Sequence, residues 1–95
     1  MVRISTNAIA LMEKSRRQQG IPESQGVRIY GEDDGAGGLR VRLTFAEDPD
    51  EGDELLEEQG TEFYVAPEVM VPLQDTIIDV ADEDSEQFAL RPDNI

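Results

Sequence analysis

The chain has 95 residues, 22 of them Asp or Glu and 8 Lys or Arg, and it contains neither cysteine nor histidine. The missing thiols and imidazoles exclude a disulfide framework, a zinc knuckle, a nucleophilic thiol and the usual general base near neutral pH. Leu, Ile, Val and Phe number 24, which is enough for one compact core. We therefore expect a single domain over residues 1–95, and no enzyme.

Acidic residues are concentrated in the later part of the chain. Residues 31–95 carry 20 acids and three Arg, so most of the surface repels phosphate and we expect no nucleic-acid partner. The cations Lys14, Arg16 and Arg17 are typical of the solvated C-terminal end of a helix. No stretch has the features of a signal peptide or approaches the roughly 20 apolar residues of a membrane span. We expect a cytoplasmic protein without a membrane partner.

The N-terminal part of the chain predicts a capped helix. Ser5, Thr6 or Asn7 is a suitable N-cap, and the helix is expected over residues 7–19, ending at Gly20 before Pro22. Its apolar face follows the i, i+3, i+4, i+7 spacing with Ala8, Leu11, Met12 and Ser15.

Two strands around a glycine-rich loop are predicted next. Residues 27–30 alternate as a strand, and residues 31–38 are predicted as a loop. The following strand should turn one face to the core, namely Leu39, Val41, Leu43 and Phe45. Residues 46–60 are predicted as an acidic loop with at most a short strand, anchored by Ala46, Leu55 and Leu56.

The remaining elements are short. Residues 61–65 predict a strand, residues 67–73 a helix that begins at a proline, and residues 76–81 and 87–91 two strands joined by a turn at 82–85. One longer helix, one short helix and about five strands indicate an α+β, β-rich domain with mainly antiparallel pairing.

Three patterns in the sequence could carry chemistry, and the residues at their key positions argue against each. An EF-hand loop that begins at Asp48 fails, because Asp53 stands where glycine is required and Gln59 where the bidentate Glu belongs. The glycine-rich run 35–38 leads into a strand and lies beside three acids, so it does not suit a phosphate. The pairs Glu32 with Asp34, and Asp79 with Asp82, are expected by chance among 22 acids. We predict no catalytic residues.

Five segments follow an order known from one protein family. They are Gly26-Val27-Arg28-Ile29, Gly35-Ala36-Gly37-Gly38, Leu43 to Pro49, Val65 to Asp79, and Phe88 to Asp93. Over about residues 4–94 this order resembles the HesB-like (IscA-like) A-type proteins of iron–sulphur cluster assembly. The resemblance implies a HesB-like domain with an N-terminal helix packed on a mixed, mainly antiparallel compact β-sandwich, and it allows a homo-oligomer.

The family's metal ligands are missing from the matched positions. A-type proteins are thought to hold iron or a cluster with one cysteine in a Gly-Cys-Ser-Gly turn and two in a C-terminal Cys-Gly-Cys. Ala36 stands at the turn position, and the chain ends at Ile95, before the C-terminal pair. Carboxylates do not replace soft thiolates on a cluster, so we expect no cofactor and no metal ligands.

Two functional hypotheses remain. In the first, the chain is a degenerate family member that works by protein contact, as a non-catalytic accessory or regulatory module with a protein partner. In the second, it is a weak carrier of iron or another divalent cation on carboxylates of residues 32–34 or 48–54. The first is favoured, because flexible acidic loops bind cations weakly and without selectivity.

Overall fold

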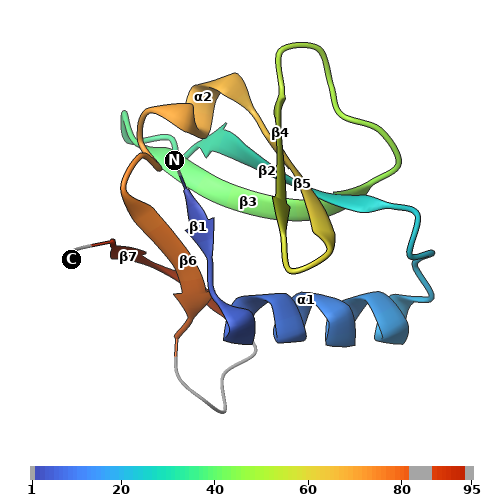
Figure 1. The fold of residues 1–95 in the computed structure, drawn as a ribbon. Coiled ribbons are helices and arrows are strands. Elements are labelled where there is room, and N and C mark those ends of the chain that lie inside the picture. The colour runs from blue at the N-terminus through green and yellow to red at the C-terminus, as the bar shows by residue number, and fades with distance from the viewer. Residues whose placement is uncertain (1, 82–86, 94–95) are drawn as a thin grey trace. The chain divides into compact units, whose positions relative to one another are not determined.

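The computed structural model describes residues 2–81 and 87–93, which form two helices and seven strands (Figure 1). In chain order these are β1 (Arg3–Ile4), α1 (Thr6–Gln19), β2 (Gly26–Asp33), β3 (Leu39–Ala46), β4 (Glu54–Glu58), β5 (Thr61–Val65), α2 (Pro67–Met70), β6 (Thr76–Val80) and β7 (Phe88–Pro92). Among the described strands, three pairings are antiparallel and two are parallel. The predicted α+β, β-rich class with mixed, mainly antiparallel sheets is therefore confirmed. The turn predicted at 82–85 lies outside the described residues.

The chain divides into two compact units. The first comprises residues 1–22 and 73–95 and contains α1 and a three-stranded sheet in the order β1-β6-β7. The second comprises residues 23–72 and contains α2 and a four-stranded sheet in the order β3-β2-β5-β4. The single domain over residues 1–95 remains a prediction.

In the first unit, α1 has the boundaries that its capping residues predict. The Oγ of Ser5 accepts a hydrogen bond from the backbone N–H of Ala8 at 3.0 Å. At the other end, Gly20 has a φ of 68°, and the N–H of Ile21 donates to the carbonyl of Arg16 at 3.0 Å. A left-handed residue of this kind ends a helix and is best supplied by glycine. The N-cap at Ser5 and the stop at Gly20 are confirmed.

The basic end of α1 differs from its prediction. Arg16 is only 5% exposed, and its Nη1 donates to the carbonyl of Pro22 at 2.6 Å. Its Nε lies 3.4 Å from a carboxylate oxygen of Glu13. Lys14 and Arg17 are exposed, as expected. Arg16 therefore helps to attach the chain after Gly20 to the helix, which the three-cation pattern did not indicate.

The N-cap of α1 is joined by hydrogen bonds to β6, and a side chain of β7 binds the same carboxylate of β6. The Ser5 hydroxyl donates to Oδ1 of Asp79 on β6 at 2.6 Å, and Nε of Arg91 on β7 donates to Oδ2 at 2.8 Å. The N–H of Val80 also donates to Oδ1 of Asp79, at 2.8 Å. The Ser5 bond is the largest of the effects that lower the pKa of Asp79. Asp79 thus has a structural role.

Replacing Ser5 with alanine is expected to lower the free energy of unfolding by about 1–2 kcal/mol, because the cap is lost together with a donor to Asp79. The effect should be largest above about pH 4 and shrink in acid, since a carboxyl with a lowered pKa contributes stability only while it is ionised. Urea unfolding at several pH values measures it. Ser24→Ala, at an exposed position, is the matched control. An equal loss of unfolding free energy in both variants would contradict a stabilising role of the bonds between Ser5, Ala8 and Asp79.

The second unit is built around β2, which pairs antiparallel with β3 and parallel with β5. Its core contains fully or almost fully buried side chains from β2, β5 and α2: Val27, Ile29, Phe63, Val65 and Val69. A two-residue connection, Gln59-Gly60, joins β4 to β5, and both residues have positive φ values of 51° and 84°. These angles match the tight hairpin turns that follow the twist of a two-stranded ribbon.

Two predictions in this unit need correction. Residues 31–33, predicted as part of the glycine-rich loop, extend β2, because Asp33 still pairs with Leu39 of β3. The alternation in β3 is confirmed, but its predicted core face is only partly buried, and Leu39 is 41% exposed. Among the described strands β3 pairs with β2 alone, and this position at the edge of the sheet leaves its face less covered than that of a central strand.

The last elements are close to their predicted positions. The second helix is shorter than expected: it begins at Pro67, ends at Met70, and is followed by a turn over residues 71–75 in which Asp75 has a φ of 59°. Strands β6 and β7 lie within one residue of the predicted ranges. β1 was not predicted, since two residues carry no periodicity.

Candidate functional site

The glycine turn between β2 and β3 is where the resemblance places a cysteine. The turn is tight: the N–H of Asp34 donates to the carbonyl of Gly38 at 3.2 Å, and Gly35 and Gly37 have φ values of 80° and 81°. Ala36 lies between these two glycines and is exposed. The turn therefore presents a methyl group at the predicted ligand position, and a methyl group binds no metal.

The carboxylate of Asp34 stabilises this turn. Its Oδ1 accepts hydrogen bonds from the N–H groups of Ala36 at 2.8 Å and Gly38 at 3.0 Å. These two bonds are the main reason that the pKa of Asp34 lies below its ordinary value. A Cβ at position 38 would collide with the same carboxylate, so a larger residue there would displace the Asp34 side chain. The carboxylate is a structural cap on the turn.

The two acids before Asp34 also have partners within the second unit. The Oδ1 of Asp33 accepts a hydrogen bond from the N–H of Gly35 at 2.8 Å. Glu32 lies 3.5 Å from Nε of Arg42 on the neighbouring strand β3. A cation at residues 32–34 would have to compete with all of these contacts.

Arg28 of β2 holds the acidic loop that follows β3. Its Nε donates to Oδ2 of Asp53 at 2.9 Å and its Nη2 to Oδ1 of the same residue at 3.1 Å. The Nη2 also lies 3.4 Å from a carboxylate oxygen of Asp50. The side chain of Asp53 is fully buried, whereas that of Arg28 is 19% exposed. This paired, two-bond geometry is among the strongest that side chains form.

Arg28 and Asp53 each stabilise the ionised form of the other. The hydrogen bond from Arg28 is the first cause of the lowered pKa of Asp53, and the same bond raises the pKa of Arg28. Asp53 also accepts a hydrogen bond from the N–H of Asp50 at 2.9 Å. The guanidinium lies 5.5 Å from the ring centre of Tyr30. The acidic loop is therefore fixed at residues 50 and 53 rather than freely flexible, a feature that the sequence pattern missed.

The carboxylates with shifted pKa values share one direction. Glu68 accepts a hydrogen bond from the N–H of Gly31 at 3.0 Å, which is the main cause of its lowered pKa. The pKa values of Asp34, Asp53 and Asp79 are lowered as well. A general acid near neutral pH needs the opposite shift. Within residues 2–81 and 87–93, no group of three or more acids is arranged to hold a metal ion.

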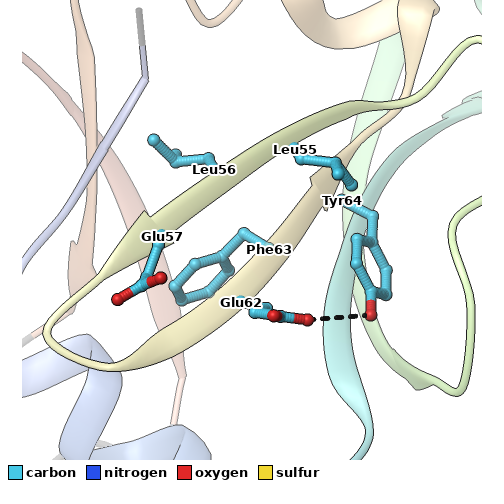
Figure 2. A pocket seen from close by; sticks show the side chains of 6 residues that line it. All are labelled: Leu55, Leu56, Glu57, Glu62, Phe63 and Tyr64. Atoms are coloured by element: carbon cyan, nitrogen blue, oxygen red, sulfur yellow. Dashed lines mark hydrogen bonds between the residues drawn. The ribbon is translucent and has the colours of Figure 1, made fainter.

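A shallow pocket of about 270 Å³ lies along the β4–β5 hairpin (Figure 2). Leu55, Leu56 and Glu57 line it from β4, and Glu62, Phe63 and Tyr64 from β5. The ring of Phe63 is fully buried, whereas Leu55 is 65% exposed, so the predicted anchoring role of Leu55 is wrong. The hydroxyl of Tyr64 donates to Oε2 of Glu62 at 3.4 Å, and burial is the first cause of the raised pKa of Tyr64.

Comparison with solved structures shows the same fold in three proteins. The structure of IscA with a 2Fe-2S cluster matches with a TM-score of 0.78 and 25% identity, over 99% of this chain and 86% of that one. SufA of Escherichia coli, a protein of iron–sulphur cluster biosynthesis, matches with a TM-score of 0.73 and 24% identity, over 99% and 82% of the two chains. The chain has the A-type fold. A protein from Aquifex aeolicus matches at 23% identity with a TM-score of 0.73, over 95% and 89%.

The resemblance to the A-type family is therefore confirmed at the level of the fold, and this chain has that fold without any cysteine. No family model matches the sequence. No curated protein matches it either.

The side chains present do not fit an iron–sulphur cluster. Cluster irons need thiolates or, in some cases, imidazoles, and the 95 residues contain neither. At the turn, the potential ligand position is a methyl group, and the adjacent Asp33 and Asp34 carboxylates accept backbone hydrogen bonds. Separately, none of the helices in the described parts of this A-type fold is long and apolar enough to cross a bilayer.

Proposed function

We propose that this chain is a non-catalytic accessory or regulatory module of the A-type fold, located in the cytoplasm, that works by binding another protein and does not hold a cluster. The observation that carries the proposal is the turn at residues 35–38, where Ala36 occupies the ligand position and Asp34 is used to stabilise the backbone. This turn is closed by a backbone hydrogen bond and offers no soft ligand.

Exposed apolar side chains support a role in protein contact. In the second unit, Leu55 is 65% and Val71 77% exposed, although the same unit buries Phe63 and Ile29 completely. Contact with a partner would remove the exposed apolar surface of such a side chain from water, which is favourable.

The second candidate is the weak carrier of iron or another divalent cation. The 22 acids favour it, since carboxylate oxygens suit such ions. Against it, Asp34 is bound by two backbone N–H groups and Asp53 is bound by Arg28 and by the N–H of Asp50. A cation at either carboxylate would compete with these hydrogen bonds for the same carboxylate, so we infer that binding is weak.

Calorimetry separates the two candidates. Titration of the chain with ferrous iron under anaerobic conditions, with calcium and with magnesium, at about 0.15 M salt, is expected to give no saturable heat. A one-site isotherm with micromolar affinity would establish the carrier instead. The variants Asp34→Asn and Glu51→Gln then locate any such site, because the first removes a charge at the turn and the second removes one from an exposed position of the acidic loop.

A further inference from the structure

The outer edge of β4 has no partner strand among the described residues. β4 is the last strand of its sheet and pairs with β5 alone among the described strands. Its five residues are Glu54, Leu55, Leu56, Glu57 and Glu58. An unpaired edge presents a row of backbone donors and acceptors to any extended chain that matches it.

The register shows which backbone groups point outward. Glu58 and Thr61 close the two-residue turn, so this pair exchanges both backbone hydrogen bonds, and bonded and non-bonded pairs then alternate along the hairpin. Glu54, Leu56 and Glu58 therefore bond to β5. The N–H and carbonyl groups of Leu55 and Glu57 face away from it.

Along β4, the side chains follow the order acidic, apolar, apolar, acidic, acidic. Leu55, 65% exposed, and the partly buried Leu56 form an apolar centre. Glu54 lies on one side of this centre, and Glu57 and Glu58 on the other. None of these three acids forms an ion pair with a residue in the described part of the chain, so their negative charge is not compensated locally.

We propose that the β4 edge binds, as an added antiparallel strand, an extended segment of a partner protein with the order basic, basic, apolar, apolar, basic. Read from the partner's N-terminus, these side chains lie opposite Glu58, Glu57, Leu56, Leu55 and Glu54. The three cations face carboxylates, and the two apolar residues cover the leucines. This inference rests on the proposed function as a protein-binding module, and it names the surface and the kind of partner.

Charge complementarity decides between a partner protein and a second copy of the chain. Two β4 edges placed side by side would bring acids against acids, which is destabilising in paired strands. The other edge of the sheet, β3, alternates Leu39, Arg40, Val41 and Arg42, and this order does not match two adjacent apolar residues flanked by cations. The net charge of −14 opposes self-association further.

The test uses a capped synthetic peptide, Thr-Lys-Lys-Val-Val-Lys-Thr, and measures its binding to the full chain by fluorescence anisotropy. We expect a saturable 1:1 curve below about 1 mM peptide. The isomer Thr-Lys-Val-Lys-Val-Lys-Thr has the same composition and charge, and should bind at least about tenfold more weakly. The version with Glu in place of Lys should not bind.

Backbone pairing is tested separately with two N-methylated peptides. Methyl groups on the second Lys and the second Val block the donors that face Leu55 and Glu57, so binding should be lost. Methyl groups on the first Lys and the first Val lie on the opposite edge of the peptide and should be tolerated. Equal affinity of the two methylated peptides would overturn the added strand, because it would leave charge attraction alone.

Variants of the chain locate the site. Leu55→Ser should weaken binding of the Lys peptide at least about tenfold. Glu57→Lys should weaken it as well and restore binding of a peptide with Glu as its third residue. Glu51→Lys makes the same charge change at an exposed position outside β4, and it should have a small effect. An equal loss with Glu51→Lys, or no saturation by the Lys peptide, would overturn the proposal.

Two further outcomes have distinct meanings. If sedimentation velocity finds an oligomer of the unmodified chain that Leu55→Ser dissociates, a second copy occupies the edge and the partner segment proposed here is wrong. A saturable metal isotherm, by contrast, would contradict the proposed function without touching the peptide result. Failure of the Lys peptide beside flat metal calorimetry would reject this surface and leave the proposed function in place.

Discussion

Anaerobic reconstitution of the chain with iron, sulphide and a reductant, followed by desalting, is expected to leave a colourless protein. A bridging-sulphide cluster requires thiolate or imidazole ligands, and none of the 95 residues supplies one. The absorbance spectrum should lack the visible charge-transfer band, and iron and sulphide should be close to zero per chain. We expect no cluster at all rather than a weakly bound one, because the chain has no thiolate or imidazole to bind it.

The controls for this experiment are the variant Ala36→Cys and the IscA whose structure contains a 2Fe-2S cluster. IscA carried through the same procedure should become coloured, which validates the reagents. The variant should stay colourless, since one thiolate per chain does not complete a cluster site. A stable brown product with stoichiometric iron and sulphide from the unmodified chain would disprove the cluster-free function.

Replacing Arg28 with alanine is expected to lower the free energy of unfolding by about 3 kcal/mol. The change leaves the buried carboxylate of Asp53 without its two guanidinium bonds, and an uncompensated buried charge is costly. The melting temperature should fall by more than about 10 °C for a chain of this size. Arg28→Lys keeps the charge but loses the two-bond geometry, so it should be intermediate.

The pH dependence identifies Asp53 as the cause. Its pKa is lowered in the folded chain, so the pair stabilises the fold above the unfolded value of about 3.9 and loses this contribution as the pH falls through the lower, folded value. The difference between the wild type and Arg28→Ala should therefore shrink below about pH 4. Arg40→Ala, at an exposed position of β3, should cost less than about 0.5 kcal/mol and serves as control. A difference that stays constant down to pH 2 would show that lost packing of Arg28, and not its charge pair, is responsible.

Elements specified by neighbouring residues could be predicted well. Helix α1 depends on Ser5 and Gly20, which act within one turn of the chain, and its boundaries agree with the structure. β5 was predicted without error at residues 61–65. The exposed Ala36 turn could also be located, because glycines at positions 35 and 37 adopt the positive φ angles that a tight turn requires.

Features that depend on distant residues were missed or only partly predicted. β1 exists because Arg3 and Ile4 pair with β6, more than 70 residues away along the chain. β2 is longer than its own pattern indicates, because β3 continues to pair with it as far as Asp33. The hairpin turn at residues 59–60 carried a usable signal, a glycine between two short strands, but the surrounding acids obscured it.

The sequence by itself determined the chemistry that is excluded and the fold class. The absence of Cys and His and the alanine in the glycine turn are properties of composition and local order, and they need no tertiary information. The tertiary structure alone decided what each acid does. Asp53 pairs with Arg28, Asp79 binds the cap of α1, and the acids of β4 remain unpaired among the described residues. Ion pairs and hydrogen bonds act over only a few ångströms. The role of each acid therefore depends on which residues, often far away in the sequence, the fold brings close to it.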